Sequence, residues 1–179
     1  FKNIRILQIS TRPFDFWTTM CNEGELLEKF NIQLSPIPMT ELIEEIKAVK
    51  EEKTKLNEML DVIHETMEVQ IKENEVENVA ALAAAMKNLV EKYGCQAAAI
   101  QCWNALQTEI GIMPCAANAI LNEEGIPVVC ETDIHGAVTA LLVEAAGMGE
   151  VRSFFADWTI RHPNLDIGEL LQHCGPWPV

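Results

Sequence analysis

Basic residues are scarce in this chain. Its 179 residues include 13 Lys and Arg against 27 Asp and Glu, which gives a formal net charge of −14. Proteins that bind nucleic acids or anionic membrane surfaces usually present a basic face, and no apolar run here reaches the roughly 18 residues of a membrane span. The composition therefore argues against nucleic acid and against membrane as partners.

Sequence motifs of common cofactor sites are also missing. The chain contains no GxGxxG and no GxxxxGK[ST], so neither a dinucleotide site nor a P-loop is predicted. Its six cysteines include no CxxC pair, and no spacing among them supports a zinc site. Most of them lie inside apolar segments, which predicts reduced, mostly buried thiols in a cytoplasmic protein.

The chain does have an alternation of strand-like and helix-like segments. The apolar runs "IRILQIS", "IQLSPIP", "QAAAIQ" and "PVVCE" are typical of buried strands, and "RSFFADW" and "ELLQHC" predict two more. Segments with helical periodicity separate most of these runs. Strands separated by helices predict a Rossmann-like layered α/β fold, a parallel sheet with long helices on both faces.

The predicted helices carry end signals. Asn22 and Asn74 are each followed by a glutamate three positions later, which predicts an N-cap at each asparagine. Gly94 is a predicted left-handed C-cap. Apolar residues recur at helical spacing from Leu42 to Met67, which predicts a long helix with a charged, solvated face.

Polar residues follow the predicted strand of residues 128–130. Because ligands of α/β proteins bind beyond the carboxyl ends of the strands, Glu131 and Asp133 are candidate site residues. On an extended chain their side chains project the same way, with about 6–7 Å between the Cα atoms; His135 joins them only if the extension persists, and Gly136 favours a turn. Two carboxylates and an imidazole suit Mg²⁺ or Mn²⁺. The alternative is that these acids cap the next helix or pair with a basic residue.

Two further polar residues occupy predicted strand ends. Asp157 closes the run "VRSFFAD", which is predicted to be a buried strand, and His173 follows "ELLQ". Each could be a structural hydrogen-bonding group when considered singly. Polar residues at three predicted strand ends in one half of the chain favour the interpretation that these residues belong to one functional site.

The segments "NAILNEEGIPVVCETDIHGA", "FFADW" and "LLQHCGPWP" together resemble the L-fucose/L-arabinose isomerase family, in particular its fucose isomerase-like branch. The amino-terminal segment from "IRILQIS" to "MTELIEEI" is similar to the start of the family's second domain. The resemblance covers nearly the whole chain and implies a fragment. Residues 1–126 would be the α/β domain, and residues 127–179 the beginning of a truncated C-terminal catalytic domain.

The resemblance implies an aldose–ketose isomerase that uses Mn²⁺ or a similar divalent metal and an enediol intermediate. Asp133 corresponds to the family's metal-binding aspartate, and Glu131 precedes it in the family's E-x-D pattern. The resemblance implies that both are catalytic residues and metal ligands. His135, a candidate from the local residue pattern alone, is the third predicted metal ligand. The metal polarises the sugar oxygens so that a carboxylate can remove a carbon-bound proton. The implied partners are a small-molecule sugar and further copies of the same protein in a homo-oligomer.

The chain departs from the family at two points. Asn118 stands where the family has a metal-binding glutamate, and an amide cannot serve as a base; Glu131 itself or Glu109 could replace it. Alternatively the chemistry is lost, and the protein is a non-catalytic sugar-binding or regulatory relative. The family's metal-binding histidine lies beyond the last residue of this chain.

Four residues are candidates for contact with the sugar. Gln101 and Trp103, in "IQCWN", resemble a sugar-contacting segment of the family, although Trp103 could equally be a core residue. Asn118 and Asp157 are the other two. A third reading of the chain is a solute-binding-type α/β domain, which would bind a sugar without any metal.

Overall fold

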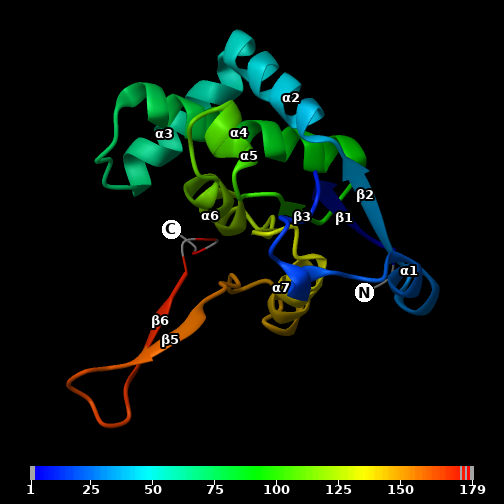
Figure 1. The fold of residues 1–179 in the computed structure, drawn as a ribbon. Helices are drawn as coiled ribbons and strands as arrows, with labels where there is room; N and C mark the ends of the chain where they lie inside the picture. Colours follow the sequence, from blue (N-terminus) through cyan, green and yellow to red (C-terminus); the bar gives the residue numbers. More distant parts are fainter. Residues whose placement is uncertain (1–2, 174, 176, 178–179) are drawn as a thin grey trace.

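The structure, a computed structural model, describes residues 3–173, 175 and 177. Its centre is one parallel sheet in the order β2-β1-β3-β4 (Figure 1). The strands are β1 (Ile4–Ile9), β2 (Ile32–Ile37), β3 (Ala97–Ile100) and β4 (Val128–Val129). All four were predicted from the apolar runs, and the layered α/β fold is confirmed.

One face of the sheet is covered by four helices (Figure 1). They are α2 (Met39–Glu52), α3 (Thr54–Thr66), α4 (Glu73–Tyr93) and α6 (Cys115–Glu123). Leu7, Ile9 and Ile100 point toward this layer and are fully buried. Leu7 and Ile9 point to the same face of the sheet because successive side chains along a strand point to opposite faces.

Helix α4 lies at the centre of that layer and contacts α2, α3, α6 and β1. Its segment from Ala80 to Met86 is buried at every position, with Leu82 and Met86 as the only large side chains. Small residues allow neighbouring elements to approach a helix from several sides. The alanine-rich sequence therefore explains how one helix can be enclosed by three others and the sheet.

The opposite face of the sheet is covered by α1 (Glu23–Phe30) and α7 (Ile134–Ala146) (Figure 1). Leu26 of α1 and Ile134 of α7 pack against Ile6 and Ala99. Helices on both faces leave the strands buried, as expected for a parallel sheet. The predicted domain boundary between residues 126 and 127 falls between α6 and β4, both of which belong to this packed unit.

The helix ends follow the sequence signals in part. The Asn22 side chain accepts a hydrogen bond from the Glu25 backbone N–H (3.1 Å), and Gly94 ends α4 in the left-handed conformation, as predicted. Helix α4 begins after Lys72, however, and not at Asn74. The predicted single helix over residues 42–67 is also wrong, because Lys53 adopts a left-handed conformation (φ 57°) and separates α2 from α3.

The C-terminal segment differs most from the prediction. Strands β5 (Asp157–Arg161) and β6 (Glu169–Gln172) form an antiparallel hairpin that extends away from the sheet (Figure 1), and all of their residues are exposed. The predicted buried strand over "VRSFFAD" is wrong: Asp157 begins β5, and residues 153–156 are irregular. β5 does not join the parallel sheet and pairs instead with β6, the next strand along the chain.

Two short helices complete the structure, η1 (Trp17–Thr19) and α5 (Ala105–Glu109). They lie in the segments that follow β1 and β3. Within the described part of the chain, no helix combines the length and the hydrophobicity needed to cross a bilayer.

Candidate functional site

The carboxyl ends of β1, β3 and β4 meet at one edge of the sheet. β1 and β3 are neighbours, while the chain leaves β1 toward β2 on one side and leaves β3 toward β4 on the other. In open α/β sheets ligands bind at such a point, outside the carboxyl ends of the strands where the connections diverge. Ser10 and Gln101 occupy these two strand ends, and the Ser10 hydroxyl donates a hydrogen bond to the Gln101 side-chain oxygen (2.6 Å).

The chain makes a tight turn directly after β4. Glu131 (φ 54°) and Thr132 (φ 52°) are both in the left-handed region, so the predicted extension of the strand to Asp133 is wrong. The Thr132 N–H donates to the Ile100 carbonyl (3.0 Å), and its hydroxyl donates to the Thr11 carbonyl (3.1 Å). Such conformations cost on the order of 1–3 kcal/mol each and concentrate at functional sites, where surrounding contacts impose them.

Asp133 begins helix α7. Its Oδ1 accepts a hydrogen bond from the Gly136 N–H (2.9 Å), so the capping alternative that the sequence left open does occur. His135 lies in the first turn of α7 and lines a groove between α7 and α1 as well as a cavity that Asp133 also lines. It is absent from the small cavity that Glu131 lines.

That small cavity has a volume of about 20 Å³ and lies between the turn after β4 and the base of the hairpin. Its lining includes Glu131 and Asp133 from the turn and Phe155 and His173 from the hairpin side. The His173 Nδ1 and Asp157 Oδ2 are 3.2 Å apart, so Asp157 supports the imidazole from outside. The structure thus brings together the polar residues that follow β4 and those that flank the hairpin.

The environment of Glu131 favours its protonated form. Burial raises the pKa of the Glu131 carboxyl above its usual range, and the nearby carboxylates of Asp133 and Asp157 raise it further. A hydrogen bond from Cys102 and the proximity of His173 act in the opposite direction but are smaller than the effect of burial. A carboxyl group with a raised pKa can hold and release a proton closer to neutral pH.

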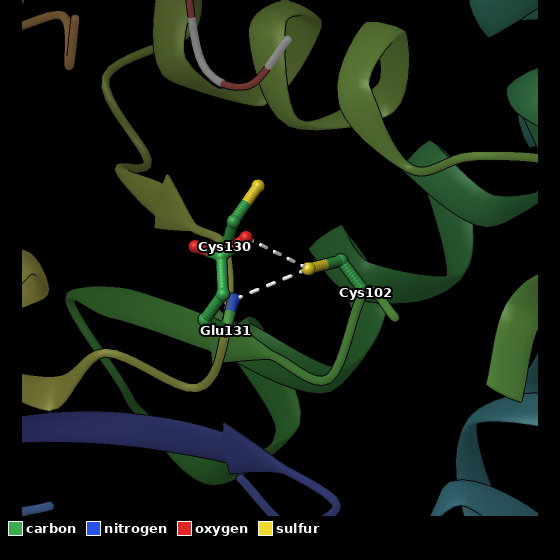
Figure 2. Close-up of side chains that lie close together, drawn as sticks. All are labelled: Cys102, Cys130 and Glu131. Atoms are coloured by element: carbon green, nitrogen blue, oxygen red, sulfur yellow. Dashed lines mark hydrogen bonds between the residues drawn. The ribbon is translucent and has the colours of Figure 1, made fainter. Parts of the chain in front are cut away.

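Two thiols adjoin the Glu131 carboxylate, and no role was predicted for either of them. The Cys102 Sγ donates a hydrogen bond to Glu131 Oε1 (3.3 Å) and accepts one from the Glu131 backbone N–H (3.3 Å). The carboxylate and the backbone N–H of Glu131 therefore both face this sulfur (Figure 2). The hydrogen bond between Cys102 and Cys130, followed by burial, holds the pKa of the Cys130 thiol far above its usual range. Cys102 and Cys130 follow neighbouring strands closely, which is the sequence signal that could have identified them.

The predicted metal ligands Glu131, Asp133 and His135 do not form a compact set. Among the described residues, the group whose ligand atoms all lie within 4.8 Å of one another is Cys102, Cys130 and Glu131. Glu131 and Asp133 line the small cavity, whereas His135 shares a different cavity with Asp133 and does not line the small one.

An open cleft of about 470 Å³ lies at the same edge of the sheet. Gln101, Trp103 and Glu109 line it, together with residues 13–16 of the loop after β1. The Trp103 side chain is 48% exposed and packs at 6.2 Å between ring centres against Phe16, so it is not a core residue. The cleft therefore brings together the two predicted sugar-contacting residues and the acid considered as a substitute base.

Asn118 reaches this edge from α6. Its side chain is fully buried, its Nδ2 lies 3.6 Å from Cys130 Sγ, and its Oδ1 has no hydrogen-bond partner in the structure. Asn118 is thus next to the residue that precedes Glu131. This agrees with a location at the site, but the amide contacts a thiol and does not line the cleft or the small cavity.

Comparison with known proteins identifies related sequences. No protein-family model matches the chain. It is 26% identical over 175 residues to a sulfoquinovose isomerase of Alkalicoccus urumqiensis, which covers 97% of this chain and 39% of that protein. It is 23% identical over 145 residues to sulfoquinovose isomerases of Priestia aryabhattai and Priestia megaterium, covering 80% of this chain and 32% of each.

The chain therefore spans about 39% of the length of the Alkalicoccus protein and less of the other two. The names of these relatives specify a sugar isomerase without specifying the L-fucose/L-arabinose type that the motifs resemble. The similarity to the Alkalicoccus protein extends over 97% of this chain and therefore includes both the sheet and the site at its carboxyl edge. The chain is accordingly similar to one part of a family of sugar isomerases.

Proposed function

We propose that the protein to which this chain belongs is a metal-dependent aldose–ketose isomerase of the L-fucose/L-arabinose isomerase type. The observation that carries the proposal is the pairing of Glu131 and Asp133 in one cavity at the carboxyl edge of the sheet, beside a cleft that contains Gln101 and Trp103. The chain would supply the α/β domain and the beginning of a catalytic domain. The similarity to sulfoquinovose isomerases supports the reaction class.

The reaction moves a hydrogen between two adjacent carbons of the sugar, and Glu131 is proposed to carry the proton. Its Oε atoms would take the proton from C2 of the aldose and return it to C1 of the enediol, while the proton of the O2 hydroxyl passes to O1. Burial of Glu131 raises the pKa of its carboxyl, which brings the group nearer to the pH at which it must both accept and release a proton. Because Asn118 cannot hold a proton, Glu131 takes over this task in the proposal.

The donor atoms present fit a divalent cation such as Mn²⁺ in part. Carboxylate oxygens of Glu131 and Asp133 are ligands that Mn²⁺ prefers, and Asp133 uses only Oδ1 to cap α7. His135, which lines a second cavity together with Asp133, completes the proposed ligand set. The bound ion would polarise the carbonyl and hydroxyl oxygens of the sugar.

The sugar is proposed to occupy the cleft beside Gln101 and Trp103. The Gln101 amide offers a hydrogen-bonding group held in place by Ser10, and the exposed Trp103 ring offers an apolar face. Asp157 and Asn118 would act through their neighbours His173 and Cys130. The proposal also includes a cytoplasmic location and a homo-oligomeric state.

Activity of the full-length protein tests this proposal. The assay measures ketose formation from sulfoquinovose, L-fucose and L-arabinose, with Mn²⁺ and after treatment with a chelator. Glu131→Gln should lower kcat by about 10²–10⁴-fold, because it removes the proton carrier. Asp133→Asn should abolish Mn²⁺ binding measured by calorimetry while α7 keeps an N-cap, since asparagine caps as well as aspartate.

Two controls accompany these variants. Glu58→Gln removes an exposed carboxylate of α3 and should leave activity unchanged. Glu109→Gln tests the substitute base in the cleft: a loss equal to that of Glu131→Gln would move the proton carrier to Glu109. A wild-type protein that neither binds Mn²⁺ nor converts any aldose would refute the proposal.

Asn118 favours a second candidate, a non-catalytic sugar-binding or regulatory relative. Its amide replaces the carboxylate that the family uses at that position, and its Oδ1 accepts no hydrogen bond within the part of the chain that the structure describes. In that case a sugar should bind to the wild-type protein without turnover. Binding should also be unaffected by a chelator, which distinguishes this candidate from the isomerase.

Arg12 provides a test of which sugar is bound. Sulfoquinovose carries an anionic sulfonate, and Arg12 is the only Lys or Arg within residues 10–22, 101–109 and 130–135, the segments that form this edge. Its Nη1 donates to the carbonyls of Pro13 and Phe14 (3.0 Å each), which line the cleft. Arg12→Gln should raise KM for sulfoquinovose about 10–100-fold and leave KM for L-fucose unchanged. An equal change for both sugars would refute a role in sulfonate binding.

A further inference from the structure

We propose that Cys102, Cys130, Glu131 and His173 form a binding site for a thiophilic divalent cation, with Zn²⁺ as the best match. The inference rests on contacts within this chain and does not depend on the proposed isomerase activity. It goes beyond the oxygen-rich Mn²⁺ site because it uses two thiols that the proposed reaction leaves without a role.

The spacing of three of the ligands carries the first step. The Sγ atoms of Cys102 and Cys130 and a carboxylate oxygen of Glu131 all lie within 4.8 Å of one another (Figure 2). Zinc binds thiolates at about 2.3 Å, so two sulfurs on one tetrahedral ion are separated by about 3.8 Å. Shifts of about an ångström or less would therefore bring these atoms to ligand positions around one ion.

The small cavity is a second, independent observation. Cys130, Glu131 and His173 all line it, and its volume of about 20 Å³ matches the space needed by one water or ion. A Cβ placed on Gly175 would clash with His173 Nε2 and lie 3.2 Å from Cys130 Sγ. The Nε2 edge of the imidazole and the Cys130 sulfur therefore both lie beside Gly175.

The surrounding hydrogen bonds are those that a metal site requires. Metal-binding histidines usually donate their other ring N–H to a carboxylate, and Asp157 Oδ2 lies 3.2 Å from His173 Nδ1. Thiolate ligands are stabilised by N–H donors; the Glu131 N–H lies 3.3 Å from Cys102 Sγ, and Asn118 Nδ2 lies 3.6 Å from Cys130 Sγ.

Ordinary core cysteines are the competing explanation, and the polarity of this site argues against it. Core thiols behave as small apolar groups and are usually surrounded by apolar side chains. Cys102 and Cys130 instead adjoin a half-buried carboxylate and a fully buried amide whose Oδ1 has no hydrogen-bond partner among the described residues. Two thiols favour Zn²⁺ over Mn²⁺, because soft sulfur ligands select the softer ion. Binding replaces the thiol protons, so it releases protons to the solvent.

Metal binding by the purified, reduced chain tests the proposal. Co²⁺ serves as the spectroscopic probe because thiolate ligation produces a sulfur-to-cobalt charge-transfer absorption, and Zn²⁺ is then added as a competitor. One Co²⁺ should bind per chain with this absorption and be displaced by Zn²⁺. Cys102→Ser and Cys130→Ser should each abolish the absorption, and Glu131→Gln and His173→Gln should each weaken binding about 10–100-fold. Asp157→Asn should weaken it by a similar factor through His173.

Cys95→Ser is the matched control. Cys95 is also buried, but it lies before β3, at the opposite edge of the sheet, where it contacts the Tyr93 carbonyl. This variant should bind Co²⁺ and Zn²⁺ like the wild type. Absence of the charge-transfer absorption in the wild type, or its persistence in both cysteine variants, would overturn the proposal.

Alkylation of the wild-type chain answers the case in which a cysteine variant fails to fold. Zn²⁺ should slow alkylation of Cys102 and Cys130 at least about tenfold and leave Cys21 and Cys95 unaffected. Equal protection of all four thiols, or of none, would refute the site. No measurement here depends on sugar turnover, so failure of the proposed isomerase activity would leave the result intact.

Discussion

The parallel sheet and the β5–β6 hairpin are stabilised in different ways. β1 contributes Ile6, Leu7 and Ile9 to the core without measurable exposure, whereas Trp158 of the hairpin is 77% exposed. A two-stranded hairpin is at best marginally stable alone. The sheet is therefore held by burial on both faces, and the hairpin depends on the contacts at its base.

Those contacts are few and aromatic. Phe154 stacks on Trp177 with ring centres 4.7 Å apart, and Phe155 meets His173 edge-on at 4.8 Å. His173 then joins Asp157 at the start of β5. The hairpin is therefore coupled to the rest of the molecule through Phe155 and His173, which also line the small cavity.

Hydrogen exchange should show the largest difference between the two regions. The amides of β1 and β3 should exchange only when the whole domain unfolds, while those of β5 and β6 should exchange by local opening. We expect protection in the sheet to exceed that in the hairpin by more than about 1,000-fold. Equal protection in both regions would contradict this expectation, because it would show that the apolar hairpin is covered in solution.

Truncation of one large side chain in each region should give the next largest effect. Leu82 is fully buried in α4, so Leu82→Ala should lower the free energy of unfolding by about 2–5 kcal/mol. Trp158→Ala, in the exposed hairpin, should change it by less than about 0.5 kcal/mol. Urea unfolding measures both effects. A loss of stability from Trp158→Ala as large as that from Leu82→Ala would show that the hairpin contributes as much to stability as the packed unit.

The smallest expected effect concerns an ion pair on the packed unit. The Glu41 carboxylate accepts hydrogen bonds from Lys92 Nζ (2.8 Å) and Tyr93 Oη (2.6 Å), and the bond from Lys92 is the main cause of the lowered pKa of Glu41. A lowered folded-state pKa gives stability that is present above the unfolded pKa and is lost as the pH falls through the folded pKa.

Glu41→Gln should therefore lower the free energy of unfolding by about 1 kcal/mol or less at pH 7. The gap between the variant and the wild type should close below about pH 4. Urea unfolding at several pH values checks both points. Trp158→Ala should show no comparable pH dependence, and a gap that widens in acid would show that the sign is wrong.

The packed unit was largely predictable because its signals are local. The apolar run of β1, the Asn22 cap and the Gly94 cap are each determined within a few residues, and all appear in the structure. The break between α2 and α3 at Lys53 was not predictable, because left-handed positions are usually signalled by glycine and this one is a lysine. The run "VRSFFAD" likewise does not reveal that its strand partner is β6 and not the sheet.

The sequence indicated which residues follow the strands at the candidate site. It did not indicate the conformation of the turn after β4. Glu131 and Asp133 were identified because they follow an apolar run. Their left-handed turn depends on bonds from Thr132 to Ile100 and Thr11, which are distant in sequence. The proximity of Cys102 to Glu131 likewise arises from the pairing of β3 with β4. The sequence shows that each residue follows a strand but does not show that the two strands are neighbours.

The hydrogen bonds among the strand-end loops have a consequence for ligand affinity. Ser10 is tied to Gln101, Thr132 to Thr11, and the Thr19 hydroxyl to the Glu131 carbonyl (3.3 Å). These hydrogen bonds order the loops after β1, β3 and β4 in the absence of a ligand. Preorganised loops lose little conformational entropy on binding, so more of the interaction energy at this edge is available as affinity.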